Sequence, residues 1–153
     1  MNKKGLIWGG IITVVLIVLF ALPRVNDPNR DVVKVWKDAD VNCLLSHQQA
    51  SQHIHPTLQI LVNGKVENIP QDIGIVTSCM AEIHTHDATG TLHAESASIT
   101  KEFTLGQFFV VYGKDMIRDG YTLEATANGE AINNPENIVL QDGLPIVLHY
   151  QSI

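Results

Sequence analysis

A single helix in the otherwise strand-rich C-terminal domain is indicated by Thr104-Leu105-Gly106-Gln107-Phe108-Phe109-Val110-Val111-Tyr112-Gly113. The apolar residues at positions 105, 108, 109 and 112 recur at the spacing of one helix face. Thr104 is a residue type that commonly caps a helix N-terminus, and Gly113 is the type that most often ends one. Because hairpins precede this helix and further strands follow it, we expect an α+β domain.

Turn signals place strands on both sides of the helix. Residues 55–62 are rich in β-forming side chains, and Asn63-Gly64 is a typical hairpin turn that leads to a return strand at residues 65–69. A second hairpin is expected from residues 80–86 and 91–96. After the helix, residues 121–127 and 146–150 indicate two more strands, whereas residues 32–45 are ambiguous between helix and strand.

The C-terminal part resembles a known fold. A strand at residues 122–127 ends in the Asn128-Gly129 turn, and Gln141-Asp142-Gly143 precedes the last strand. This order resembles the closing portion of a β-grasp, ubiquitin-like fold, in which a strand follows the helix and an Asp-Gly turn introduces the final strand. The resemblance covers roughly the last fifty residues and implies a β-grasp-like domain. A small β-sandwich is the alternative.

The N-terminus indicates a membrane anchor. Lys3 and Lys4 precede an uncharged run from Gly5 to Pro23, and about 18 apolar residues suffice to span a bilayer, whereas a signal-peptide core is usually shorter. The two lysines favour a cytoplasmic N-terminus, so the rest of the chain should be extracytoplasmic. We expect an anchor at residues 1–22, a linker at residues 23–40 and the α+β domain at residues 41–153. A cleaved signal peptide is the alternative.

The charge of the chain after Pro23, called the outer part below, excludes some classes of partner. All 16 acidic residues follow Pro23, against eight of the ten basic residues, which gives this part a formal charge of −8. An acidic domain repels nucleic acid and attracts cations, so we expect no nucleic-acid partner.

The two cysteines of the chain, Cys43 and Cys79, both lie in the outer part. In an oxidising compartment an even pair is most simply a disulfide. A metal-ligand or redox role is the alternative, although the sequence contains no Cys-x-x-Cys motif.

Five of the seven histidines gather in two short segments that we expect to be strands. Because alternate strand side chains point to the same face, each His-x-His pair presents both imidazoles to one side. Neutral imidazoles suit Cu(II), Zn(II) or Ni(II), and copper binds tightest in the divalent series. We therefore predict a transition-metal site, with copper first and zinc second, whose ligands are His53, His55, His84, His86 and His93.

The register of the second hairpin decides whether His93 joins this site. A two-residue loop at residues 88–89 pairs His84 with His93 and places both on one face. A bulge at Gly90 instead pairs His93 with Thr85 and turns its side chain away. The sequence leaves both registers open.

Other functions fit the same residues. Asp87 and Glu95 are candidate ligands, or acceptors that orient an imidazole. The histidines could instead be hydrogen-bonded to strand and turn groups in a non-metal interaction module of the cell envelope. A metal-dependent hydrolase or oxidoreductase would need a general base such as Asp87 or Glu82. The sequence contains no His-Glu-x-x-His, Gly-x-Ser-x-Gly or phosphate-binding glycine motif, so it names no catalytic residue.

Motifs over about His53 to Gly113 resemble those of a protein family. They are His53-x-His55-x-x-Leu58, Val62-Asn63-Gly64, Ile69-Pro70, Ile73-Gly74-Ile75, Cys79, Ile83-His84-Thr85-His86-Asp87-Ala88-Thr89-Gly90 and Thr104-Leu105-Gly106-Gln107-Phe108-Phe109. The family comprises small exported or membrane-anchored prokaryotic proteins, and the resemblance implies no particular activity. We expect a membrane-anchored protein that binds, delivers or buffers a metal ion, with the membrane and another envelope protein as candidate partners.

Overall fold

The computed structural model describes residues 28–44 and 50–153. The predicted anchor at residues 1–22 lies outside the described residues, as does His47. Among the described residues, no helix has the length and apolar character needed to cross a membrane.

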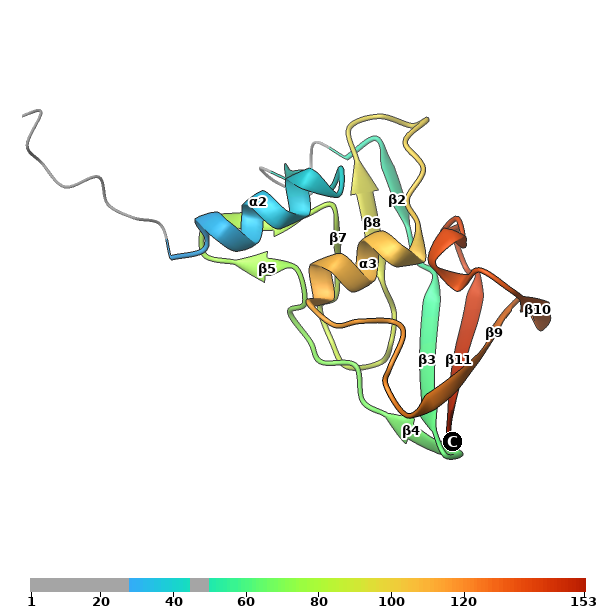
Figure 1. Ribbon diagram of the computed structural model, residues 1–153. Helices are drawn as coiled ribbons and strands as arrows, with labels where there is room; N and C mark the ends of the chain where they lie inside the picture. The colour runs from blue at the N-terminus through green and yellow to red at the C-terminus, as the bar shows by residue number, and fades with distance from the viewer. Residues whose placement is uncertain (1–27, 45–49) are drawn as a thin grey trace, which may run out of the picture.

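The predicted α+β class is confirmed, because the described residues form two α-helices and three small β-sheets (Figure 1). Helix α3 spans Leu105–Tyr112 and begins and ends as the sequence predicts. The Thr104 hydroxyl accepts a hydrogen bond from the Gln107 backbone, and the Gln107 side chain accepts one from the Thr104 backbone, which forms a capping box. Gly113 ends the helix with a φ of 69°.

The largest sheet has five strands in the order β10-β9-β11-β3-β4. The strands are β3 (Thr57–Val62), β4 (Lys65–Glu67), β9 (Tyr121–Ala127), β10 (Glu130–Ile132) and β11 (Pro145–Ser152). β3 and β4 form the predicted hairpin through Asn63-Gly64, and β11 runs parallel to β3 and antiparallel to β9. A 3-10 turn at Pro135–Asn137 lies between β10 and β11. Ile60 and Leu148, from neighbouring strands of this sheet, are fully buried in the core.

A second sheet carries the histidines. Its strands are β2 (Gln52–Ile54), β8 (His93–Ser96) and β7 (Ile83–His84), in that order. The paired stretch of the β7-β8 hairpin is shorter than predicted, because residues 85–92 lie outside the two strands. Thr91 pairs with Thr57 instead. Gly90, with a φ of 86°, accepts a hydrogen bond from the Leu58 backbone, so this loop lies against β3.

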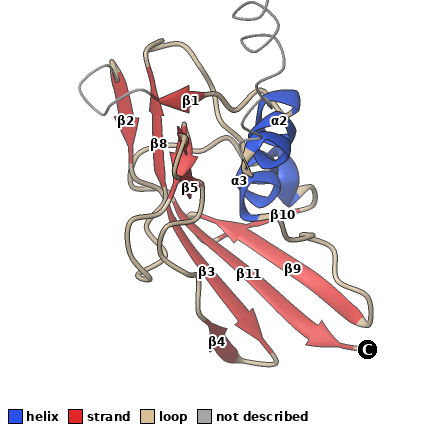
Figure 2. Ribbon diagram, turned by 90° about the vertical axis from the view of Figure 1, so that its left-hand side faces the viewer, coloured by secondary structure: helices blue, strands red, loops and turns tan. Residues whose placement is uncertain are grey.

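The third sheet joins a strand near the start of the described residues to two strands from residues 75–81. The sheet has the order β1-β6-β5, from Cys43–Leu44, Cys79–Ala81 and Ile75–Val76. Helix α2 spans Arg30–Asp38 and lies against α3 (Figure 2), so the ambiguous residues 32–45 contain both a helix and a strand. Trp36 of α2 is buried in the core, which therefore includes a side chain from the range expected as a linker. The predicted disulfide joins Cys43 of β1 to Cys79 of β6.

Candidate metal centre

Strand pairing brings four polar side chains onto one face of the β2-β8-β7 sheet. His84 of β7 pairs directly with His93 of β8, and Glu95 of β8 pairs directly with His53 of β2. His93 and Glu95 are two residues apart on one strand and so point to the same side. Their direct cross-strand partners share that side. The sheet therefore places one histidine from each of its three strands on the same face as the carboxylate of Glu95.

The two remaining predicted ligands extend this face beyond the strand ends. His55 follows β2, and its ring centroid lies 4.4 Å from that of His53. His86 follows β7, and its ring centroid lies 4.6 Å from that of His84. The ring of His93 is central, with centroid distances of 4.6 to 5.4 Å to the other four imidazoles. All five predicted histidines thus form one cluster.

The register question is settled for His93. Its pairing with His84 is the one expected from a short loop, and His93 stays on the histidine face. The connection differs from that expectation, because residues 85–92 form a long loop rather than a two-residue turn. Gly90 has the positive φ that was considered for a bulge, but it uses this conformation to approach β3.

Within the cluster, two overlapping groups of side chains could hold a metal ion. One comprises His84, His86, His93 and Glu95, and the other comprises His53, His55 and His93. Each group offers one ligand atom per residue, and these atoms lie within 4.8 Å of one another. The described part of the chain therefore contains a histidine-rich site with the donor number of a transition-metal centre.

The distances between donor atoms match those of atoms bound to one ion. His84 Nε2 lies 3.0 Å from His86 Nε2 and 3.6 Å from Glu95 Oε1. Two nitrogen atoms that each bind an ion at 2.0–2.1 Å lie about 2.9 Å apart at a right angle and about 3.3 Å apart at the tetrahedral angle. These separations are therefore compatible with an ion bound between these atoms.

A backbone contact fixes which nitrogen of His84 faces the cluster. His84 Nδ1 lies 2.9 Å from the carbonyl oxygen of Ala81. Because a carbonyl oxygen only accepts, Nδ1 carries the hydrogen and the neutral ring keeps its acceptor lone pair on Nε2. Nε2 is the atom next to His86 and Glu95. A hydrogen bond from the outer nitrogen to a carbonyl is the usual way in which proteins orient a histidine ligand.

Burial divides the cluster into an inner and an outer part. The side chains of His84 and Glu95 are fully buried, whereas those of His53 and His55 are 41% and 44% exposed. Burial is the main cause that lowers the pKa of His84 to about 4. Burial, followed by the neighbouring His86, also lowers the pKa of His93 to about 4. Both imidazoles are therefore neutral near pH 7, which is the form that binds metals.

Close backbone packing supports β7 beneath the inner histidine. A Cβ atom at Gly74 would lie 2.6 Å from the carbonyl oxygen of Ile83 and 3.2 Å from Cβ of His84. Gly74 also has a φ of 79°, a conformation that favours glycine. A side chain at position 74 would consequently displace the strand that carries His84.

The two carboxylates considered as general bases have other partners. Glu82 Oε2 accepts hydrogen bonds from the Asn42 backbone at 2.8 Å and from Lys101 Nζ at 2.7 Å. Asp87 Oδ1 accepts hydrogen bonds from the backbone and hydroxyl of Thr89, which lower the pKa of Asp87. Neither belongs to either metal-binding group. The buried carboxylate at the cluster is Glu95.

A second carboxylate beside the cluster, that of Asp142, is not indicated by the sequence. Asp142 Oδ1 accepts a hydrogen bond from the His55 backbone at 2.8 Å and lies 3.5 Å from His55 Nδ1. The two residues are 87 positions apart. Asp142 belongs to the Asp-Gly turn before β11, and no local sequence signal relates that turn to β2.

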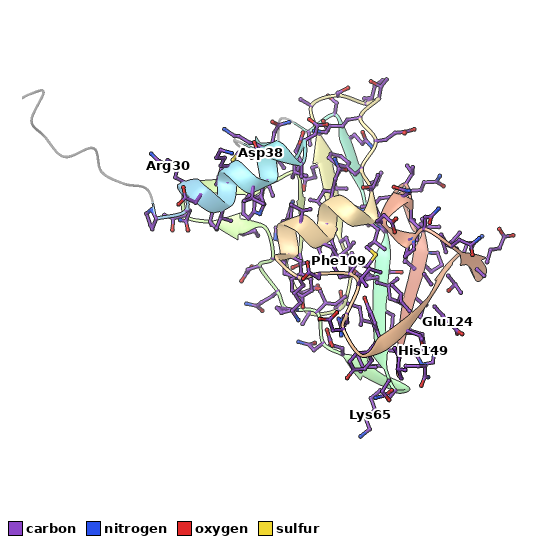
Figure 3. The ribbon with its side chains drawn as sticks, in the orientation of Figure 1. Arg30, Asp38, Lys65, Phe109, Glu124 and His149 are labelled. Atoms are coloured by element: carbon purple, nitrogen blue, oxygen red, sulfur yellow. A yellow bond between two sulfur atoms is a disulfide. The ribbon has the colours of Figure 1, made fainter. Side chains whose placement is uncertain are left out.

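His149 lies on a different sheet from the cluster. His149 pairs with Glu124 on the five-stranded sheet (Figure 3), and its Nε2 lies 2.8 Å from the Gln151 side chain.

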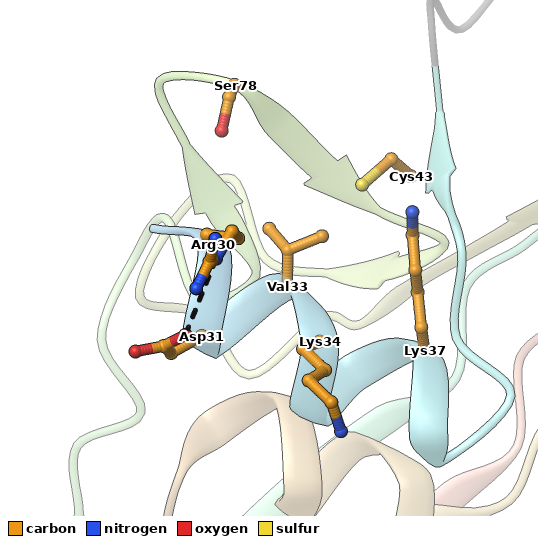
Figure 4. A pocket seen from close by; sticks show the side chains of 7 residues that line it. All are labelled: Arg30, Asp31, Val33, Lys34, Lys37, Cys43 and Ser78. Carbon is orange, nitrogen blue, oxygen red and sulfur yellow. Dashed lines mark ion pairs between the residues drawn. The ribbon is translucent and has the colours of Figure 1, made fainter. Parts of the chain in front are cut away.

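A pocket of about 540 Å³ lies beside α2 and Cys43, and Figure 4 shows the basic side chains of Arg30 and Lys37 among those that line it. None of the lining residues belongs to either metal-binding group.

The fold and the cluster together define an α+β protein with a histidine-rich site that could hold a metal ion. No protein-family model, curated protein or solved structure matches this chain. The cluster is therefore the feature on which a functional assignment rests.

Proposed function

We propose that this chain is a membrane-anchored, extracytoplasmic protein that binds a transition-metal ion and delivers or buffers it. The observation that carries the proposal is the approach of His84 Nε2 to within 3.0 Å of His86 Nε2, beside the carboxylate of Glu95. Together with His93 these residues supply three imidazoles and one carboxylate.

The arrangement favours a metal ion over a purely structural role for the histidines. At 3.0 Å, the Nε2 atoms of His84 and His86 need either a hydrogen on His86 Nε2 or a cation between them, because two acceptor nitrogens repel. The acceptor nitrogen of His84 is already defined by the hydrogen bond to Ala81. A structural role would need only that hydrogen bond, and it leaves the convergence of five imidazoles without a cause.

Copper is the first choice of metal and zinc the second. Imidazole nitrogen suits both, and Cu(II) binds more tightly than Zn(II) to a given set of donors. Four donors that include His84 and Glu95 also match the usual coordination number of zinc. The negative charge of the chain after Pro23 would raise the local concentration of either cation.

Delivery or buffering is favoured over catalysis. His53, His55 and His86 are exposed, so an ion at the rim could exchange with a ligand from another envelope protein. The candidate general bases, Glu82 and Asp87, accept hydrogen bonds elsewhere. A non-metal interaction module would not require His84 to be oriented toward the other imidazoles.

The five-stranded sheet with α3 is proposed to be a β-grasp domain, with residues 68–104 inserted between its first hairpin and its helix. Support comes from the order β4-β3-β11-β9-β10 and from the parallel pairing of β3 with β11. Residues 1–22 are proposed as the anchor, and the chain as a member of the exported family that its motifs resemble.

A metal titration tests the proposed function. The full chain in detergent is stripped with a chelator and titrated with Cu(II) and with Zn(II) by calorimetry. We expect sub-micromolar binding. Loss of groups that merely orient a ligand typically costs about 10- to 100-fold in affinity, so the H84A/H86A variant should lose at least about 100-fold.

The matched control is H149A, which removes a histidine outside the cluster. Its affinity should equal that of the wild type. Equal affinities of the wild type and a folded H84A/H86A variant would contradict the proposal.

A further inference from the structure

We propose that the histidine cluster provides two ion positions, an inner one at His84, His86, His93 and Glu95 and an outer one at His53 and His55. This inference rests on the proposed function, because both positions lie in the same site. It adds the number of ions, their order of binding and the route by which an ion enters.

The first support is the grouping of donors. The inner group and the outer group of histidines have only His93 in common. The His53 and His55 rings lie 4.4 Å apart, and the His84 and His86 rings lie 4.6 Å apart, with the His93 ring between the two pairs. The cluster is therefore two pairs that share a central ring.

The second support is the number of donors. Five imidazoles and one carboxylate give six donor side chains, whereas a protein-bound zinc ion usually takes four and a square-planar copper ion also takes four. An ion that uses the four inner donors leaves His53 and His55 without a role in its coordination. Two imidazoles completed by solvent form a second, weaker position.

The third support is the placement of negative charge. Two divalent cations repel each other, so a two-ion site needs anions between or beside them. Glu95 Oε1 lies 3.2 Å from His53 Nε2 and 3.6 Å from His84 Nε2, so it faces both positions. Asp142 adds a second carboxylate on the outer side, 3.5 Å from His55 Nδ1.

Exposure sets the order of the two positions. His53 and His55 are partly exposed at the surface, whereas His84 and Glu95 are fully buried. An ion from solvent or from a partner therefore first meets an exposed rim, formed by His53 and His55 of the outer position and His86 of the inner one. His93 Nδ1 lies 3.1 Å from His53 Nε2, which places a shared ligand between entry and the inner donors. The outer position is an entry site with fast exchange, and the inner position is a holding site.

The experiment counts bound ions. The chelator-stripped full chain in detergent is titrated with Cu(II), and bound copper is measured by equilibrium dialysis and elemental analysis. We expect two equivalents per wild-type chain, the second bound at least about tenfold more weakly. The H53A/H55A variant should bind one equivalent with an affinity close to that of the first. The H47A/H149A variant, which lacks the two other histidines, should still bind two equivalents.

Three other results would each overturn the two-position inference. One equivalent in the wild type would overturn the two-position inference and leave the proposed function standing. No binding in the wild type would overturn both. Loss of both equivalents in an H53A/H55A variant whose circular dichroism spectrum matches the wild type would also overturn the inference, because the inner position would then depend on the outer pair.

Discussion

His84 should make the metal-free protein sensitive to mild acid. In the unfolded chain its imidazole takes up a proton near pH 6.5, whereas burial lowers its pKa in the folded state to about 4. Between these values the unfolded state binds more protons than the folded state. The free energy of unfolding must therefore fall as the pH falls from 6.5 to 4.

The magnitude follows from the size of the pKa change. One pKa unit corresponds to about 1.36 kcal/mol, so His84 alone should remove roughly 3 kcal/mol of stability across this pH range. Its side chain is fully buried, and water therefore screens little of this effect. A loss of this size is a large part of the 5–15 kcal/mol that stabilises a typical domain.

The H84N variant isolates this contribution. Its side-chain amide can still donate to the Ala81 carbonyl but does not titrate between pH 4 and 7. Urea unfolding is followed at several pH values in the presence of a chelator. The difference in unfolding free energy between wild type and variant should change by about 3 kcal/mol between pH 7 and pH 4. A difference that stays constant with pH would refute the reasoning, since burial would then not keep His84 neutral.

Two further predictions concern the supports of the site. The disulfide between Cys43 and Cys79 closes a loop with a sequence separation of 36, for which the loss of chain entropy gives about 4 kcal/mol; urea unfolding of C43S/C79S should show this loss, and a change below about 1 kcal/mol would contradict it. Gly90→Ala should destabilise the protein more than Gly129→Ala in the same assay. Both glycines have positive φ, but only at Gly90 would a Cβ atom meet the backbone of β3, so equal losses would speak against that close approach.

Features set by neighbouring residues could be predicted from the sequence. Helix α3 was predicted with both ends, because Thr104 and Gly113 are local signals for a helix start and stop. The β3-β4 hairpin followed from Asn63-Gly64 in the same way, since φ is positive at both positions. Local conformational preference was sufficient in each case.

The candidate site was predicted in its residues but not in its geometry. The sequence identified five histidines, yet it left the pairing of His84 with His93 as one of two registers. The hydrogen bond from Leu58 to Gly90 holds the loop against β3, and this contact is not visible from residues 85–92 alone. The direct pairing of His53 with Glu95 is equally non-local.

An anomalous-scattering measurement on crystals of the chain, grown with zinc or copper, tests the central claim most directly. We predict a peak at bonding distance, about 2.0–2.2 Å, from Nε2 of both His84 and His86 and from a carboxylate oxygen of Glu95. Well-ordered histidines with no peak between them at saturating metal, or a peak only at His149, would contradict the account.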